Sequence, residues 1–173
     1  MTARRATTSE GHHNDAGDSP FPRFERLRNA GWEPVDLGGH EVVARLHLEL
    51  RPGPQAAGEG RHALDRLRGA VAERGLDTLR LLVTELVSNS VRHGSREEWI
   101  QLDVDIYANA VRVEVHDAGP GFRQEGTPQP HADRPGGWGL CLVDRLADRW
   151  GVARDDRTRV WFEIDSARLA AAA

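Results

Sequence analysis

The sequence predicts an α+β two-layer sandwich, in which a mostly antiparallel mixed sheet is covered on one face by helices. Every expected strand alternates apolar and polar residues, so one face of the sheet meets solvent and the other meets helices. Two of the strands are joined by a tight turn at Asn109, which makes them an antiparallel hairpin. The elements follow the order strand, helix, helix, hairpin, loop, helix, hairpin, which fits this two-layer class.

Length and composition favour one folded domain that works in the cytoplasm. The chain has 173 residues and a formal net charge of −4. This size supports one domain with its own core, and the negative balance argues against nucleic acid or an anionic membrane as a partner. No apolar run approaches the roughly 20 residues that span a bilayer, and the first residues lack the apolar region of a signal peptide. Cys141 is the only cysteine, so we expect no disulfide framework and a reducing, cytoplasmic location.

Three segments are expected along the chain. Residues 1–38 are polar and rich in Gly, Pro and Arg without a sustained period, which predicts a flexible N-terminal arm. Residues 39–166 carry the folded domain, and residues 167–173 form a tail that ends in alanines. Part of the arm has apolar residues that could dock as a short helix: Phe21, Phe24, Leu27 and Trp32.

The first half of the domain is expected to hold one strand and two helices. Alternation predicts a strand over residues 44–50, and the Gly- and Pro-rich stretch 51–60 predicts a loop. A helix is expected over residues 62–74, ending at Gly75, which is a favourable residue just past a helix end. A longer helix is expected over residues 77–93.

The second half is expected to hold two hairpins and one helix. The long helix has Asp77 as its predicted N-cap and ends at Gly94. Strands over 100–106 and 111–115 form the first hairpin. The remaining expected elements are a polar loop over 122–136, a helix over 139–148, and short strands over 149–153 and 158–164.

The expected helix 77–93 carries polar residues along one stripe. Glu85 and Asn89 are four residues apart, so their side chains share a side of the helix, and His93 is one step further along. A carboxylate beside an amide oxygen can bind a hydrated Mg²⁺ and orient a water or hydroxyl. On this helix alone, the favoured alternative is a solvent-exposed Glu85 with Ser88 and Asn89 hydrogen-bonding locally.

Asp117 is the most informative single residue. Strand parity places it with Val113 and Val115, on the face that holds the core. A buried carboxylate is costly unless it is hydrogen-bonded, and Gly119 and Gly121 just after it let the backbone turn sharply beside a ligand. Such a carboxylate can accept a hydrogen bond from an exocyclic amine such as that of adenine. The alternative, about equally weighted, is a turn aspartate that caps Gly119.

Two further sequence features point to the same kind of ligand. Thr158 shares parity with Val160, so its hydroxyl points into the core layer, although strand propensity alone also explains a threonine. Gly137 and Gly139 open a helix, where backbone N–H groups and the helix dipole favour phosphate. An ordinary helix start after a loop is the alternative. The loop 122–136 is long for a compact domain, and loops of this length are usually lids or disordered; a lid over phosphates fits its position.

Other candidates are set aside. The remaining histidines show no metal-ligand spacing, so zinc is not expected: His12, His13, His40, His47, His62, His116 and His131. Cys141 is expected in the core, and Trp138, Trp150 and Trp161 are expected to pack rather than to stack on a base.

In combination, these motifs resemble a known family. The residues that carry the resemblance are Glu85 and Asn89 in E-x-x-x-N, Asp117, Gly119 and Gly121 in D-x-G-x-G, Gly137, Gly139 and Leu140 in G-x-G-L, and Thr158 on a late strand. This set is similar to the ATP-binding fold of gyrase, MutL and histidine kinases (the GHKL, or Bergerat, superfamily), and covers about residues 41–165. The stretch ELVSNSVRHG at residues 85–94 resembles the anti-sigma-factor serine/threonine kinases and small actinobacterial histidine-kinase-like ATP-binding proteins.

The resemblance implies ATP and Mg²⁺ as cofactors and gives each residue a role. Asn89 would ligate Mg²⁺, and Glu85 would be the base that acts on the attacking hydroxyl. Asp117 would bind the adenine amine with support from Thr158. The remaining nucleotide-binding residues would be His93, Gly119, Gly121, Gly137, Gly139 and Leu140. Departures from the family pattern are Trp138 between two glycines, Pro128 and Pro130 in the loop, and the arm of about 40 residues.

The resemblance also implies a function. A protein of this class would phosphorylate a small anti-sigma-factor antagonist on Ser or Thr and regulate transcription by sequestering a partner. Its partners would be a sigma factor, the antagonist or both, and it could form a homodimer. One alternative is a catalytically weak ATP-binding adaptor without phosphotransfer. Another is a histidine-kinase catalytic domain that acts in trans. A gyrase- or MutL-type ATPase fits less well, because such enzymes use a second transducer domain.

Overall fold

A six-stranded antiparallel sheet organises the protein. The computed structural model describes residues 33–36, 41–121 and 138–169. The strand order is β1-β2-β3-β4-β6-β5, and every neighbouring pair is antiparallel. The expected α+β sandwich is therefore confirmed, with an antiparallel rather than a mixed ladder. The strands are β1 (Glu33–Asp36), β2 (Glu41–Leu50), β3 (Ile100–Tyr107), β4 (Ala110–Asp117), β5 (Arg149–Arg154) and β6 (Thr158–Asp165).

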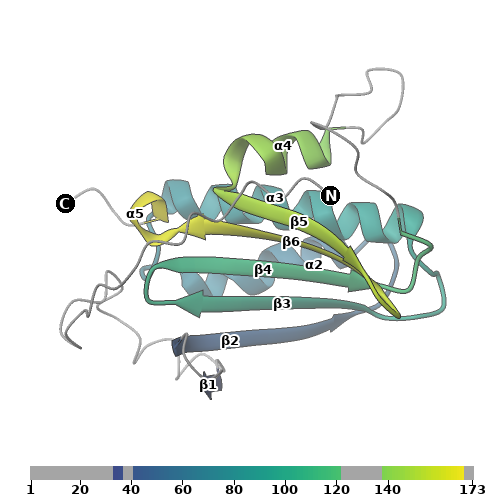
Figure 1. The fold of residues 1–173 in the computed structure, drawn as a ribbon, viewed down its shortest axis with the longest axis horizontal. Helices are drawn as coiled ribbons and strands as arrows, with labels where there is room; N and C mark the ends of the chain where they lie inside the picture. The colour runs from purple at the N-terminus through teal and green to yellow at the C-terminus, as the bar shows by residue number, and fades with distance from the viewer. Residues whose placement is uncertain (1–32, 37–40, 122–137, 170–173) are drawn as a thin grey trace.

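The helices gather on one face of this sheet. In Figure 1 the sheet lies in front of α3 and α2, and α4 runs beside α3. None of the described helices has the length and apolar character that a membrane crossing requires. The helical elements are α2 (Ala56–Ala63), the 3-10 helix η1 (Leu64–Leu67), α3 (Glu73–His93), α4 (Gly139–Leu146) and α5 (Ser166–Leu169).

The prediction of a helix over residues 62–74 is wrong, because α2 begins earlier, at Ala56, inside the expected loop 51–60. Gly58 and Gly60 make this stretch look like a breaker, yet Gly60 is buried where α2 meets the core. A Cβ built at Gly60 would lie 3.2 Å from Leu102 and 3.3 Å from Val83, so the glycine permits close packing of helix on sheet. The α-helix ends at Ala63 and continues as η1.

The long helix α3 begins at Glu73 rather than after Asp77, so Asp77 is not its N-cap. Gly75 lies inside the first turn and is buried. A Cβ there would lie 2.9 Å from a methyl carbon of Leu169, so this close packing requires a glycine. The backbone N–H of Ala72, the N-cap residue, donates to the carbonyl of Leu169 over 2.7 Å. The short helix α5 therefore supports the start of α3, an arrangement that no local signal predicts.

Some other expected boundaries hold, whereas the helix expected to end at residue 148 ends at Leu146 and α5 extends into the expected tail 167–173. Gly94 ends α3, and its N–H donates to the Ser90 carbonyl over 2.8 Å. Both hairpins form where alternation predicts them, and the helix after the loop begins at Gly139. Strand β1 lies in the segment expected to be a flexible arm. The rest of that arm, with its four apolar residues, lies outside the described residues, as do the loop 122–136 and Gly137.

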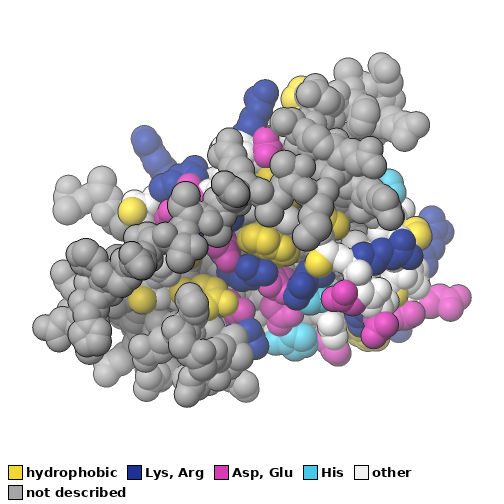
Figure 2. All heavy atoms as spheres, viewed as in Figure 1, with side chains coloured by type: hydrophobic (Ala, Val, Ile, Leu, Met, Phe, Trp, Pro, Cys, Tyr) yellow, Lys and Arg dark blue, Asp and Glu magenta, His cyan; other side chains and the backbone are white. Residues whose placement is uncertain are grey.

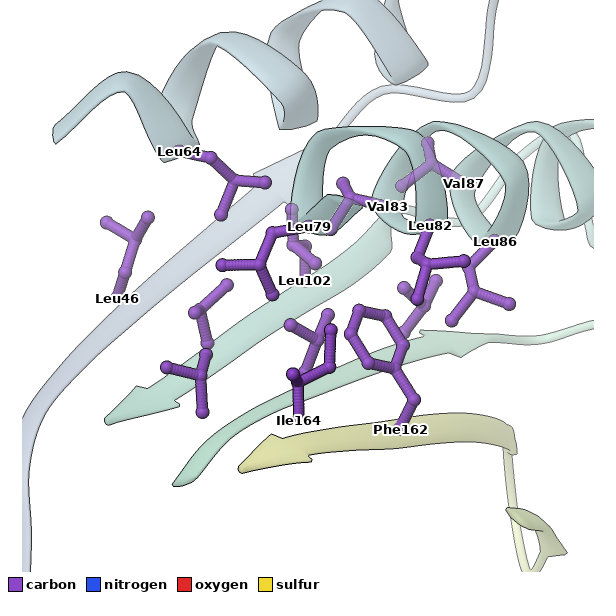
Figure 3. Close-up of a cluster of buried hydrophobic side chains, with 14 of the residues drawn as sticks. Leu46, Leu64, Leu79, Leu82, Val83, Leu86, Val87, Leu102, Phe162 and Ile164 are labelled. Carbon is purple, nitrogen blue, oxygen red and sulfur yellow. The ribbon is translucent and has the colours of Figure 1, made fainter. Parts of the chain in front are cut away.

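The core lies between the sheet and α3. The inward residues of α3 meet those of β3, β4 and β6, and Figure 3 shows their side chains interleaved between helix and strands. Phe162 is fully buried at the centre of β6, opposite Leu82 and Leu86 of α3. Burying such side chains stabilises the fold by roughly 1.5–3 kcal/mol each. This packing fixes α3 against the ends of β4 and β6, where the sequence motifs converge.

The other face of the sheet carries a network of charges. Arg45 of β2 forms a bidentate ion pair with Asp105 of β3, at 2.5 and 2.7 Å. Arg112 donates to Glu114 at 2.5 Å and to Glu163 at 2.7 Å. Figure 2 looks onto this side of the sheet and shows basic, acidic and histidine side chains interspersed. Arg45 with Asp105 and Arg112 with Glu163 are direct cross-strand partners of opposite charge, an arrangement that stabilises a sheet.

Candidate nucleotide site

Asp117 ends strand β4 in a buried position, as strand parity predicts. The residue is 8 % exposed. The hydroxyl of Ser90 on α3 donates to Oδ2 over 2.6 Å, and the N–H of Gly119 donates to Oδ1 over 2.8 Å. The turn-capping alternative is thus realised, because the carboxylate binds the N–H of Gly119, and the contact to an adenine amine stays a prediction. Each carboxylate oxygen can accept a second hydrogen bond, so the group keeps capacity for a ligand amine.

Thr158 stands beside Asp117 in the sheet. The two residues are direct partners across the β4–β6 ladder, and Thr158 is 3 % exposed. Its hydroxyl donates to the carbonyl of Gly119 over 3.1 Å. The turn after β4 is thus held from one side by Asp117 and from the other by Thr158.

Gly119 and Gly121 are required because the backbone of this turn lies very close to neighbouring atoms. Gly121 has a φ of +69°, a conformation that favours glycine, and a Cβ there would lie 2.8 Å from the Thr158 hydroxyl. A Cβ at Gly119 would lie 2.7 Å from the carbonyl oxygen of His93. The turn therefore packs directly against the end of α3, and side chains at these two positions would clash with it.

Glu85 and Asn89 meet the start of α4. Both are half-buried on α3, and Gly139 is buried against them. A Cβ at Gly139 would lie 2.9 Å from Asn89 Nδ2 and 3.1 Å from Glu85 Oε2. The structure thus brings a carboxylate and an amide together with a helix N-terminus, where backbone N–H groups favour an anion. These are groups suited to Mg²⁺ and to phosphate.

The remaining expected site residues are placed less directly. His93 is exposed, and its backbone carbonyl, rather than its ring, approaches the turn at Gly119. Leu140 is half-buried and packs against the core at the start of α4. Gly137 lies outside the described residues.

The sequence predicts that three tryptophans and one cysteine pack. Trp138 does not, because half of its surface is exposed at the N-cap of α4. The other two are half-buried: Trp150 donates from Nε1 to Asp144 over 3.0 Å, and the ring of Trp161 lies under the Arg112 guanidinium. Cys141 is buried, as expected.

Sequence reasoning missed Ser90, the residue that binds Asp117 from α3. A signal was present, because Ser90 follows Leu86 by four residues and so continues the buried stripe of α3. A polar side chain at a core position requires a hydrogen-bond partner. Its partner lies 27 residues away, so only the fold identifies it.

A separate cleft of about 410 Å³ lies between α2, η1 and α3, away from these motifs, and its lining includes Arg61, Asp65 and Arg80. Arg80 is paired there with acidic neighbours: it contacts Asp65 and donates to Asp77 over 3.0 Å. The ion pairs of Arg80 thus tie α3 to η1 in this cleft.

Comparison with known proteins identifies relatives of this chain and of its fold. The family model described as histidine kinase-like ATPase domain matches residues 51–164. The proteins named serine-protein kinase RsbW from Listeria innocua and from Listeria monocytogenes are each 29 % identical over 119 residues, covering 60 % of this chain and 76 % of the relative. The crystal structure of the RsbU and RsbW domains of a Mycobacterium tuberculosis protein matches with a TM-score of 0.55 at 20 % identity, covering 69 % of this chain. The chain spans 31 % of that longer protein, so this likeness concerns the fold. On the match to two thirds of its length, the chain belongs to the histidine kinase-like ATPase family.

Proposed function

We propose that this protein binds ATP with Mg²⁺ and transfers the γ-phosphoryl group to a serine or threonine of a partner protein. The observation that carries the proposal is the buried Asp117 carboxylate, bonded to Ser90 and Gly119 and flanked by Thr158. A buried carboxylate with acceptor capacity suits an adenine amine. Gly119 and Gly121 beside it put no side chains next to this carboxylate.

The opposite end of the site suits the phosphates. Asn89 would hold Mg²⁺ through its amide oxygen, and the N-terminus of α4 at Gly139 would face the phosphates with its N–H groups. When bound, Mg²⁺ neutralises phosphate charge, which is the main requirement of phosphoryl transfer. His93, Gly137 and Leu140 are proposed as further contacts along this end.

Glu85 is the proposed base. Its Oε2 lies beside the start of α4, near the position assigned to the terminal phosphate. Glu85 would accept the proton of the attacking hydroxyl while the new O–P bond forms and the bond between the β–γ bridging oxygen and the γ-phosphorus breaks, releasing ADP. The groups on this chain thus position and polarise the reactants and form no covalent intermediate.

The proposed substrate is a small anti-sigma-factor antagonist, and the proposed regulated partner is a sigma factor. The support is the resemblance of the ELVSNSVRHG stretch to anti-sigma-factor kinases and the 29 % identity to proteins named serine-protein kinase RsbW. Sequestration of one partner and phosphorylation of the other would link nucleotide state to transcription. A cytoplasmic location and a homodimer belong to the same proposal.

Two measurements test the function. Calorimetric titration of MgATP into wild type and Asp117→Ala should show micromolar binding that the variant loses. Transfer of labelled phosphate to a candidate antagonist should then be lost in Glu85→Ala while ATP binding is retained. Absence of ATP binding to wild type would overturn the proposal. Wild-type binding without any labelled product would make the protein a nucleotide-dependent adaptor, and transfer by Glu85→Ala at the wild-type rate would overturn the role of Glu85.

A further inference from the structure

Arg154 occupies a position beside the proposed adenine end that the motif residues do not explain. It is the last residue of β5 and the direct ladder partner of Thr158 on β6. Direct partners in an antiparallel pair point to the same face of a sheet. Thr158 points to the helix side, so Arg154 also points there, continuing the row of Trp150 and Val152 that packs on the core.

The side chain of Arg154 lies over the glycine turn. A Cβ built at Gly121 would lie 3.1 Å from Arg154 Cδ and 3.6 Å from Nε. The same point is 2.8 Å from the Thr158 hydroxyl. The backbone of Gly121, the Thr158 hydroxyl and the Arg154 stem thus meet at one place, next to the carboxylate of Asp117.

Arg154 also differs from its neighbours in charge pairing. Arg149, at the other end of β5, donates to Glu163 over 2.6 Å, and Arg159 on β6 lies 3.8 Å from Glu114. Within the part of the chain that the structure describes, no acidic side chain forms such a pair with Arg154. Because the chain contains no lysine, arginines and histidines supply all of its cationic side chains.

We propose that Arg154 lies against the nucleotide base and raises the affinity of the protein for adenine nucleotides. This inference rests on the proposed function. A guanidinium is planar, weakly hydrated and stacks on aromatic faces, which suits it to cover a purine. With Asp117 at the edge of the base and Arg154 over its face, both the amine and the ring would be contacted.

The location favours the base over the phosphates. Arg154 adjoins Gly121, whose turn packs on the end of α3, whereas the proposed phosphate groups lie at Glu85 and Asn89. Asn89 precedes Gly94 by five residues, or roughly 7.5 Å along the helix axis. In Figure 1, the tip of the β5–β6 hairpin lies at the same end of the molecule as the end of β4.

The test compares Arg154→Ala and Arg154→Met with wild type in the full chain, titrated with Mg²⁺ complexes of ATP and ADP and with AMP. Arg154→Met keeps an apolar stem but removes the charged plane. Arg159→Ala is the matched control, because Arg159 lies next to Thr158 and faces the opposite side of the sheet. Thermal unfolding of each variant checks that the fold is intact.

We expect Arg154→Ala to weaken all three nucleotides by a similar factor, roughly fivefold to tenfold, and Arg159→Ala to leave them unchanged. Equal affinity of Arg154→Ala and wild type for ATP would overturn the inference. A loss for ATP that diminishes through ADP and vanishes for AMP would also overturn it, because it would assign Arg154 to the phosphates. If wild type binds and Asp117→Ala does not, these outcomes leave the proposed function standing. If wild type binds no nucleotide, both fail.

Discussion

The hydroxyl of Ser90 donates to Asp117 Oδ2 over 2.6 Å and so joins helix α3 to the end of strand β4. Both side chains are buried, and the two residues are 27 positions apart in the chain. A hydrogen bond to a buried charge is worth more than one between neutral groups, because the charge has lost its water. This contact therefore sets where the carboxylate points and also contributes to stability.

Replacing Ser90 by alanine should lower both stability and nucleotide affinity. Loss of this donor should reduce the free energy of unfolding by about 1.5–3 kcal/mol. Ser88→Ala is the matched control, because Ser88 lies on the same helix and no described side chain hydrogen-bonds with it. Urea unfolding and ATP titration of the two variants measure the difference. Equal stability of Ser90→Ala and Ser88→Ala would contradict the assigned role.

Gly139→Ala should impair the phosphate end of the site and spare the adenine end. The new methyl would stand 2.9 Å from Asn89 Nδ2 and 3.1 Å from Glu85 Oε2, so both side-chain ends must move. A displacement of about 1 Å at a reacting group can cost on the order of a hundredfold in rate. We expect phosphotransfer to fall by tenfold or more while AMP binding is unchanged. The measurements are initial rates of labelled transfer and AMP titration, and an unchanged rate would refute the placement of Gly139 beside the phosphates.

Much of the fold can be predicted from the sequence because its strands are amphipathic. Alternation is a local signal, so both hairpins and the parity that buries Asp117 and Thr158 are correctly predicted. The start of α2 is not correctly predicted, because Gly58 and Gly60 make this stretch of sequence look like a loop. Only the contact of Gly60 with Leu102 on the sheet shows why a glycine is needed there.

The candidate site also contains residues that the sequence predicts and residues that it does not. The motifs predict which polar residues gather, since Asp117 and Thr158 are brought together, as are Glu85, Asn89 and Gly139 in the second group. Ser90 and Arg154 could not be placed from spacing alone. Ser90 depends on the approach of α3 to β4, and Arg154 depends on the approach of the β5–β6 hairpin to the turn at Gly121. Both are contacts between distant segments.

Glu114 should make the stability of the protein depend on acid pH. Burial alone would raise the pKa of Glu114, but His116 at 3.3 Å, the hydrogen bond from Arg112 and the charges of Arg112 and Arg159 outweigh it. Together they lower the pKa from the usual 4.5 to about 2. Because the folded pKa is depressed, the stabilisation is present above pH 4.5 and is lost as the pH falls toward 2.

The variant Glu114→Gln isolates this effect. At pH 7 it should unfold with a free energy about 1–3 kcal/mol lower than wild type, and this difference should shrink between pH 4.5 and pH 2. Glu49→Gln serves as the control, because Glu49 is exposed on β2 and forms no ion pair with another described residue. Denaturant unfolding at several pH values measures the difference. If the difference in the free energy of unfolding between Glu114→Gln and wild type stays constant down to pH 2, the ion-pair explanation is wrong.

Gly58→Ala should stabilise the protein. Gly58 lies within α2 and, unlike Gly60, a Cβ built there meets no atom within 4 Å. Alanine is favoured over glycine in a helix interior by roughly 0.5–1 kcal/mol, because glycine loses more backbone freedom on folding. Gly60→Ala is the contrasting variant, since its methyl would press on Leu102 at 3.2 Å and Val83 at 3.3 Å. Thermal unfolding should place Gly58→Ala above wild type and Gly60→Ala below it. The reverse order would mean that α2 does not pack on the sheet through Gly60.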